Sequence, residues 1–340
     1  MPAGSNTSSV PRPALGSISY SSTGIFQCTV PGTVALTYDD GPYLYTDELL
    51  DVLKANDAKA TFFVTGNNYG KRGIDNTSTP YPDVVRRMYN EGHQIGSHTW
   101  SHQDLDTITH DERMDQMIKN EMAFRNILGL FPTYMRPPFD SCKEDTGCRD
   151  DMSALGYHII EYNIDTYDYV DYDADDVQLA KNNVTAGLQG SNTSSSYIVY
   201  AHDTHETTVN NLTAFMIQTV NEKGLKLVTI GECLGDPKEN WYRNATTGTA
   251  WTFSGNITGS SLTSTGNVSQ TGGKNGSSTL SGGSSSASPK TVTVTAASSA
   301  TAVATPSVQV QTTNAGVRAT SSASIQVMMA MGFVSLAALL

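Results

Sequence analysis

Two adjacent aspartates, Asp39 and Asp40, follow the mostly apolar run Val34–Tyr38 and come directly before Gly41-Pro42. Asp, Gly and Pro all favour turns, so the pair alone could mark no more than the end of a strand. Adjacent carboxylates repel each other, however, and are unfavourable at the end of a buried strand. A bound cation would offset this repulsion, which makes the pair a candidate site for metal-dependent chemistry.

Two histidines, His98 and His102, stand four residues apart in the segment SHTWSH. Residues i and i+4 of one helical turn share a face, so both imidazoles can reach one metal ion. The segment is not the HExxH motif of a metalloprotease, because Thr99 occupies the Glu position. This spacing is a weak metal signal by itself. Together with one carboxylate, the two histidines form a facial ligand set that leaves positions open for water and substrate.

Three more polar segments each follow a candidate strand, and each has an ordinary explanation when taken singly. They are RPPF (Arg136–Phe139), DTYDY (Asp165–Tyr169) and HDTH (His202–His205). Five polar clusters at the ends of five candidate strands are hard to explain as surface decoration. Their combination predicts one site.

Short β-like runs alternate with helical patterns between Val34 and Leu234. This order predicts an α/β fold with a parallel sheet closed, or nearly closed, into a barrel; a flat doubly wound sheet is the alternative. In both folds ligands bind at the C-terminal ends of the strands, where the polar segments fall. The expected strands are Val34–Tyr38, Ala60–Val64, Gln94–Gly96, Thr133–Arg136, Tyr157–Ile164, Tyr197–Ala201 and Lys226–Ile230. The expected helices are Thr46–Ala55, Pro82–Glu91, Asp111–Leu128 (with a core-packing stripe of Met114, Met117, Ile118 and Met122), Asp175–Leu188 and Thr207–Glu222.

Five segments in this order, TYDDGP, SHTWSH, RPPF, DTYDY and IVYAHD, resemble the five motifs of the polysaccharide deacetylases, carbohydrate esterase family 4. The resemblance spans about Pro31 to Leu234. It implies the fold of that family, a distorted (β/α)7 barrel, which agrees with the seven candidate strands. Within the family the chain is most similar to the chitin deacetylases of fungi, both in its lead-in CTVPGTVALTYDDGP and in the Ser/Thr-rich stretch described below.

The resemblance implies a metal-dependent hydrolysis of N-acetyl groups that converts chitin to chitosan and acetate. Asp40, His98 and His102 would bind one divalent metal, usually Zn²⁺, with Co²⁺ as an alternative. The metal would polarise the acetamide carbonyl and lower the pKa of a bound water. Asp39 would be the general base that deprotonates this water, and His202 the general acid that protonates the leaving amine.

Four more residues match supporting positions of the family. Arg136 would orient the base through a charge-assisted hydrogen bond, and Asp168 would pair with His202 and favour its protonated form. The backbone N–H of Phe139 would stabilise the oxyanion; many relatives have Tyr there, but a main-chain donor does not depend on the side chain. Tyr169 stands where the family commonly has Trp, which leaves the preference between N-acetyl and O-acetyl substrates open.

The composition divides the chain of 340 residues into five segments. Its net charge of −12 and pI near 4.9 argue against nucleic-acid binding. Residues 254–324 are mostly Ser, Thr, Gly, Asn, Ala and Val with few charges, which predicts a disordered stalk. The expected segments are an N-terminal extension (1–27), the catalytic domain (28–235), a C-terminal extension of that domain (236–253), the stalk (254–324) and an apolar tail (325–340).

The uncharged tail Ile325–Leu340 follows the small triplet Asn314-Ala315-Gly316 and a polar spacer ending at Ser324. This order is typical of the signal for a GPI lipid anchor, with Asn314 as the attachment candidate; a single membrane span is the alternative. No signal peptide is visible in MPAGSNTSSVPRPALG, which has no apolar core. We nevertheless expect a monomeric protein on the extracellular face of the plasma membrane and in the cell wall.

Cysteines and sequons also indicate a protein outside the cell. We expect the disulfides Cys142–Cys148, closing a short loop, and Cys28–Cys233, joining the two ends of the domain; a zinc–cysteine site is disfavoured because no CxxC pair occurs. Asn-x-Ser/Thr sequons arise by chance in such sequence, but several are glycosylation candidates. Of nine sequons, which also include Asn6, Asn256, Asn267 and Asn275, the glycosylation candidates are Asn76, Asn183, Asn192, Asn211 and Asn244.

Three other functions compete with chitin deacetylation. An acetylxylan esterase or a peptidoglycan deacetylase would use the same motifs on another substrate. A catalytically silent chitin-binding wall protein should have lost a base, acid or metal ligand, yet all five are present. A structural mannoprotein would explain the stalk but not the first 234 residues.

Overall fold

The computed structural model describes residues 1–20, 23–170, 177–252 and 255–259. The chain divides into two compact units, Met1–Gln270 and Thr271–Leu340, and the second lies wholly outside the described residues. The predicted stalk (apart from residues 255–259), the anchor candidate Asn314 and the apolar tail therefore also lie outside them. Within the described part of the chain, no helix is both long and apolar enough to cross a membrane.

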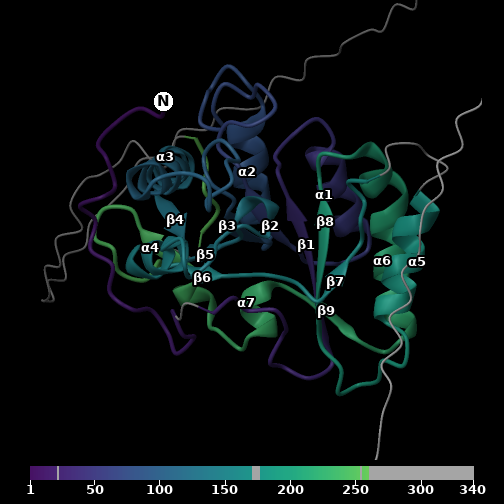
Figure 1. Cartoon of the computed structure of the whole chain (residues 1–340). Helices are drawn as coiled ribbons and strands as arrows, with labels where there is room; N and C mark the ends of the chain where they lie inside the picture. Colours follow the sequence, from purple (N-terminus) through teal and green to yellow (C-terminus); the bar gives the residue numbers. More distant parts are fainter. Residues whose placement is uncertain (21–22, 171–176, 253–254, 260–340) are drawn as a thin grey trace, which may run out of the picture. The chain divides into compact units, whose positions relative to one another are not determined.

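One parallel sheet forms the centre of the first unit (Figure 1). Its hydrogen-bonded path runs β6-β5-β3-β2-β1-β8-β7, with β9 paired to β1, so β6 and β7 are the two ends of a parallel half-barrel. The chain has the predicted α/β fold with a parallel sheet. The strands are β1 (Thr33–Asp39), β2 (Thr61–Val64), β3 (Gln94–Ser97), β5 (Tyr134–Met135), β6 (His158–Ile159), β7 (Ile164–Asp165), β8 (Tyr197–His202) and β9 (Lys226–Val228).

Helices pack against this sheet as the alternation predicts: α2 contacts β3, α4 contacts β6, α5 contacts β7 and α6 contacts β9. All seven residues of β1 are buried, as expected for a strand covered on both faces. The helices are α1 (Thr46–Ala55), α2 (Tyr81–Asn90), α3 (His110–Leu128), α4 (Cys148–Ala154), α5 (Val177–Gly187), α6 (Thr213–Glu222) and α7 (Ile230–Cys233), with 3-10 turns at Pro138–Asp140 and Lys238–Asn240. The methionine stripe of α3 packs in a second core cluster beside Cys142 and Cys148, which confirms its predicted structural role.

The predicted strand Tyr157–Ile164 is wrong as one element, because it forms two short strands, β6 and β7, with a gap between them. Two carbonyls in the gap, those of Ile160 and Glu161, accept hydrogen bonds from the Arg136 guanidinium at 3.1 and 3.0 Å. Ile25 of the N-terminal segment forms a parallel bridge with Ile160. The chain therefore leaves the sheet here, because some of its backbone groups are hydrogen-bonded to Arg136 and to the N-terminal segment instead of to a neighbouring strand of the sheet.

The predicted helix Thr207–Glu222 begins differently from the expectation, with a π-helical turn over Thr208–Leu212 before α6. The predicted helix Asp175–Leu188 is described from Val177, and its first two residues lie outside the described residues.

Both segments outside the predicted catalytic domain pack against it. At the N-terminal end, Arg12 donates two hydrogen bonds to the buried carboxylate of Glu121, at 2.6 and 2.9 Å. At the C-terminal end, β10 (Tyr242–Asn244) pairs antiparallel with β4 (Leu130–Pro132), and Trp241 is buried. The structure also forms both predicted disulfides, Cys28–Cys233 and Cys142–Cys148.

Candidate active site

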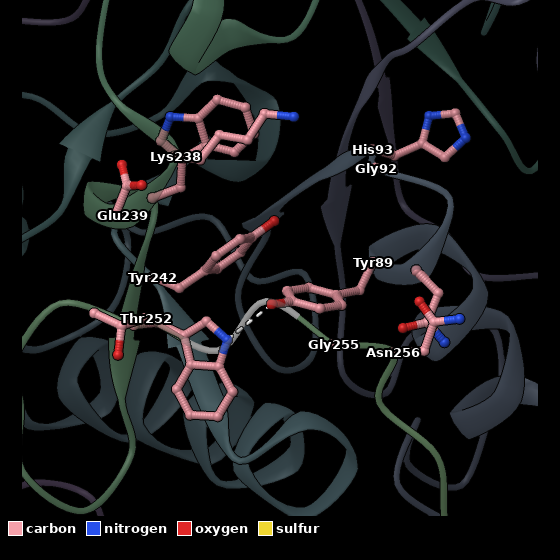
Figure 2. A pocket seen from close by; sticks show the side chains of 12 residues that line it. Tyr89, Gly92, His93, Lys238, Glu239, Tyr242, Thr252, Gly255 and Asn256 are labelled. Carbon is pink, nitrogen blue, oxygen red and sulfur yellow. Dashed lines mark hydrogen bonds between the residues drawn. The ribbon is translucent and has the colours of Figure 1, made fainter.

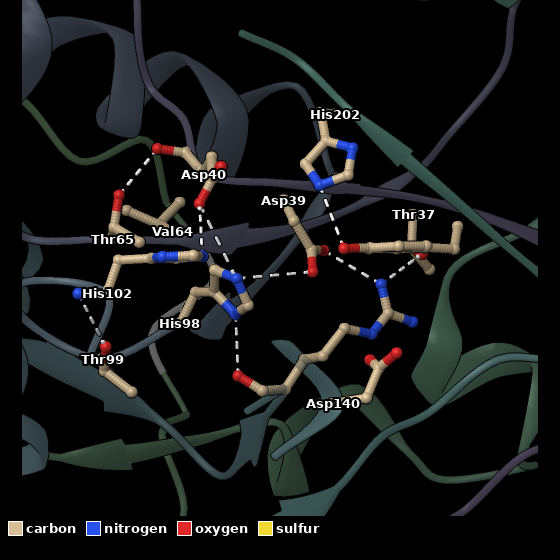
Figure 3. Close-up of polar contacts among 12 residues, drawn as sticks. Thr37, Asp39, Asp40, Val64, Thr65, His98, Thr99, His102, Asp140 and His202 are labelled. Atoms are coloured by element: carbon tan, nitrogen blue, oxygen red, sulfur yellow. Dashed lines mark hydrogen bonds and ion pairs between the residues drawn. The ribbon is translucent and has the colours of Figure 1, made fainter. Parts of the chain in front are cut away.

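The C-terminal ends of the central strands bring the predicted site residues together (Figure 3). In the register of the sheet, Asp39 at the end of β1 lies opposite His202 at the end of β8. Asp40, the next residue, has a positive φ of 79°, which turns it out of the strand. The turn that follows requires glycine, since a Cβ on Gly41 would lie 1.8 Å from the carboxylate of Asp203.

Asp40, His98 and His102 form a cluster that can hold a metal ion, because one ligand atom from each lies within 4.8 Å of the others. The Nδ1 of His98 lies 2.8 Å from the carbonyl oxygen of Arg136, which can only accept a hydrogen bond. Nδ1 therefore carries the hydrogen, and the Nε2 lone pair faces Asp40 at 3.7 Å. The Nε2 of His102 lies 3.2 Å from the same carboxylate oxygen. A lone pair aimed at a carboxylate is repelled unless a cation lies between them, so the donor set fits a divalent metal.

Burial, with His102 beside it, lowers the pKa of His98 to about 3, which keeps this imidazole neutral and able to act as a ligand. Burial also lowers the pKa of His102. Neutral imidazole is the form that binds metals.

The carboxylate of Asp40 is positioned by a loop that the sequence did not single out. Asn68 and Tyr69 donate hydrogen bonds to its two oxygens, at 3.2 and 3.1 Å. Lys71, which is buried, donates to the main-chain carbonyl of Asp40 at 2.5 Å and to the hydroxyl of Thr65 at 2.8 Å. These contacts fix the orientation of the carboxylate before any ion binds.

Asp39 is fully buried, and one of its carboxylate oxygens is paired while the other is not. Arg136 donates to Oδ1 at 2.9 Å, and to the hydroxyl of Thr37 at 2.7 Å. Oδ2 is buried without a hydrogen-bond partner among the described residues and lies 3.6 Å from the Nε2 of His98. Burial raises the pKa of Asp39 to about 7, although Arg136 opposes this. An unpaired buried carboxylate oxygen beside a metal-binding cluster can accept a proton from a water molecule there.

Arg136 is held in place on all sides. It is fully buried, its guanidinium makes the two carbonyl contacts described above, and it lies 4.4 Å from the centre of the Phe63 ring. Five N–H donors in a rigid fork suit this role, which Lys could not fill.

His202 is paired with Asp168 as the sequence resemblance implies. The Nδ1 of His202 lies 2.8 Å from Oδ1 of Asp168, and the backbone N–H of His202 donates to Oδ2 at 2.7 Å. The hydroxyl of Thr208, at the start of the π-helical turn, also donates to Oδ2 at 2.7 Å. Burial alone would lower the pKa of His202, but Asp168 outweighs it and raises the pKa to about 9.

The remaining predicted residues form the edges of the site. Phe139 has a φ of 59°, is 65% exposed, and its ring packs edge-on against His102 with centres 4.6 Å apart. Tyr169 packs edge-on against His202, with ring centres 5.4 Å apart, and its hydroxyl donates to Asp165 at 3.1 Å.

The glycosylation candidates differ in exposure. Asn192 and Asn211 are exposed, whereas Asn76, Asn183 and Asn244 are half-buried.

A second hollow lies at the opposite end of β3, beside His93, which precedes that strand (Figure 2). It encloses about 330 Å³ and is lined by aromatic side chains including Tyr89, Trp241 and Trp251. One hydrogen bond joins two of its side chains: the indole N–H of Trp251 donates to the Tyr89 hydroxyl at 2.8 Å. The hollow lies between the C-terminal segment and α2, and it is separate from the polar cluster at the strand ends.

Comparisons with known proteins agree with this geometry. A family model described as polysaccharide deacetylase matches residues 27–160. The chain is 49% identical over 221 residues to a chitin deacetylase of Colletotrichum lindemuthianum, an alignment that covers 65% of this chain and 87% of that protein. The chain belongs to the polysaccharide deacetylase family.

One further relative and one solved structure extend this similarity. A chitin deacetylase of Pestalotiopsis sp is 46% identical, over 65% of this chain and 70% of that protein. The solved structure of the chitin deacetylase from Colletotrichum lindemuthianum superposes with a TM-score of 0.62 at 48% identity, covering 66% of this chain and 96% of that one.

Proposed function

We propose that this polysaccharide deacetylase hydrolyses the N-acetyl groups of chitin, giving chitosan and acetate. The observation that carries the proposal is the juxtaposition of a three-residue metal-binding cluster with an unpaired buried aspartate and a histidine–aspartate pair. The substrate class is supported by the similarity to fungal proteins named chitin deacetylases. The same similarity favours this activity over acetylxylan hydrolysis.

Asp40, His98 and His102 would hold one divalent metal, with Zn²⁺ as the first candidate from its preference for imidazole and carboxylate ligands and Co²⁺ as the alternative. When bound, the metal polarises the acetamide carbonyl and makes a nearby water more acidic. Asp39 takes a proton from this water through Oδ2, while Arg136 holds its other oxygen. His202 supplies a proton to the departing nitrogen, with Asp168 stabilising the charged imidazolium. The backbone N–H of Phe139 donates to the oxyanion.

The proposal extends to where the protein acts. A GPI anchor attached near Asn314, a glycosylated stalk and a monomeric catalytic unit would keep the enzyme at the cell surface, with chitin in the wall as its substrate. The two disulfides support a location outside the reducing cytosol.

One assay tests the activity, the substrate and the metal together. Acetate release is measured side by side on chitin oligomers, acetylxylan and peptidoglycan, before and after a chelator and after added Zn²⁺ or Co²⁺. We expect release from the chitin oligomers, loss with the chelator and recovery with the metal. No release from chitin oligomers would refute the substrate, and full activity in a metal-free preparation would refute the mechanism.

A silent chitin-binding protein is the second candidate function, and the intact cluster counts against it. Such a protein would bind chitin and release no more acetate than a blank under every metal condition of the same assay.

A further inference from the structure

The hydroxyl of Tyr200 contacts the atom of His202 that must deliver the proton. Tyr200 is on β8, two residues before His202, so both side chains point to the same face of the strand. The Nε2 of His202 lies 3.0 Å from the hydroxyl oxygen of Tyr200. The neighbouring strand places Thr37 opposite Tyr200 and Asp39 opposite His202, so this face is the one that carries the base.

The protonation of the imidazole decides what this contact means. Its Nδ1 bonds to the carboxylate of Asp168, which accepts and cannot donate when ionised, so Nδ1 carries a hydrogen at all times. Nε2 is therefore the nitrogen that gains and loses the catalytic proton. A protonated ring has one hydrogen on Nε2, and in this arrangement that hydrogen points at Tyr200 and not into an open site.

Tyr200 is held by its surroundings, so it cannot easily move aside. Its ring stacks on that of Tyr162, with centres 4.4 Å apart and planes 7° from parallel. The guanidinium carbon of Arg136 lies 5.3 Å from the centre of the same ring. Swinging Tyr200 away from His202 would break the stack and the contact with the guanidinium, which together oppose the movement.

We propose that Tyr200 is a catalytic residue that relays the proton from His202 to the departing nitrogen. This inference rests on the proposed hydrolysis of an N-acetyl group. As the carbon–nitrogen bond breaks, the nitrogen takes the hydrogen of the Tyr200 hydroxyl, and the hydroxyl oxygen takes the hydrogen from Nε2. Tyr200 is again a neutral hydroxyl after the step, and His202 is a neutral imidazole. The amine leaves, and the acyl carbon keeps the oxygen of the water. Asp39 holds the proton which that water lost.

The relay predicts a dependence on the leaving group. An amine must be protonated as it leaves, whereas 4-nitrophenolate leaves as a stable anion and needs no proton. A structural defect would slow both reactions, because both use the same water activation. The ratio of the two rates therefore separates a relay from a packing role.

The test compares Tyr200→Phe with wild type on N-acetyl sugars (chitin oligomers and peptidoglycan fragments) and on 4-nitrophenyl acetate. Tyr200→Phe keeps the ring and the stack and loses only the hydroxyl. We expect kcat on the amide to fall by about 10²–10⁴, as for loss of a general acid, with the ester rate close to wild type and metal content unchanged. Tyr197→Phe is the matched control on the same strand, since its hydroxyl accepts from Ser191 and is not bonded to His202; it should leave both rates close to wild type.

Each other outcome has a distinct meaning. Equal amide rates for Tyr200→Phe and wild type, or an equal loss on amide and ester, would overturn the relay and leave the chitin activity standing. In a third outcome, wild type cleaves peptidoglycan fragments and leaves chitin intact, while Tyr200→Phe loses activity on the amide alone. That result would refute the proposed substrate and support the relay.

Discussion

Single side chains at the strand ends differ in role because their contacts differ. Asp39 and Asp40 are adjacent carboxylates, yet Asp39 faces Arg136 and Asp40 faces two imidazoles. The guanidinium therefore holds one aspartate as a base, and the histidines leave the other for a cation. The guanidinium offsets the charge of Asp39, and a cation between Asp40 and the two imidazoles would offset the charge of Asp40.

Replacing the proposed base separates catalysis from metal binding. Asp39→Asn should lower kcat on chitin oligomers by about 10²–10⁴, because an amide cannot take the proton from water. Its oxygen can still accept from Arg136, so we expect the fold and the bound metal to be retained, checked by circular dichroism and metal analysis. Asp111→Asn, the same change at an exposed position of α3, should match wild type. A kcat for Asp39→Asn near that of the control would exclude Asp39 as the base.

The pairing of His202 with Asp168 sets the alkaline limit of activity. A general acid must be protonated, so the rate should fall as the pH rises through the His202 pKa of about 9. Asp168→Asn removes the charge that raises this pKa. The alkaline limb of the kcat–pH profile should then move to lower pH, and an unmoved limb would show that another group sets it.

The sequence predicted these side chains but not all of their supports. Five of them could be predicted from the sequence because each lies in a short motif at the end of a predicted strand: Asp39, Asp40, His98, His102 and His202. Lys71 lies in no motif, and Tyr200, although part of the IVYAHD segment, was not predicted to have a role. The roles of both depend on contacts that only the folded chain creates. Side-chain alternation along β8 could have pointed to Tyr200, which is two residues before His202.

At the scale of elements, strands and helices with a clear period were predicted to within a few residues. The helix Thr46–Ala55 was predicted with its observed bounds. The elements that were predicted wrongly or missed depend on contacts with residues far away in the sequence. The gap between β6 and β7 depends on Arg136 and Ile25. The β4–β10 pair joins segments more than a hundred residues apart. No local pattern encodes such partners.

The long disulfide is the element-scale contact that should matter most for stability. Cys28–Cys233 joins residues 205 apart and fixes the segment before β1 to the end of α7, whereas Cys142–Cys148 spans six. On the chain-entropy model the long closure stabilises by up to about 5 kcal/mol and the short one by about 2 kcal/mol. Replacing both cysteines of a pair by Ser should therefore lower the free energy of unfolding in urea more for the long pair. A larger loss for the short pair would contradict this ranking.

At the scale of the whole molecule, the described core and the candidate site both lie within residues 1–259. The segments on either side of the predicted domain belong to this body: Arg12 pairs with Glu121, and Trp241 is buried in the core. A shorter chain cut at either predicted domain boundary would lose these contacts. We expect residues 1–259 to be sufficient for catalysis on a soluble substrate. Attachment to a surface is the role proposed for residues 260–340.

Truncation distinguishes these two roles. A chain ending at Gly259 should release acetate from soluble chitin oligomers at the wild-type rate and bind the same metal, because every proposed site residue is retained. A chain ending at Leu234 removes β10 and Trp241, so it should unfold at lower urea concentration and lose activity in proportion to its unfolded fraction. Equal stability of the two truncated chains would show that the C-terminal segment is dispensable. Loss of activity in the longer one, with its fold intact by circular dichroism, would place a catalytic contribution beyond residue 259.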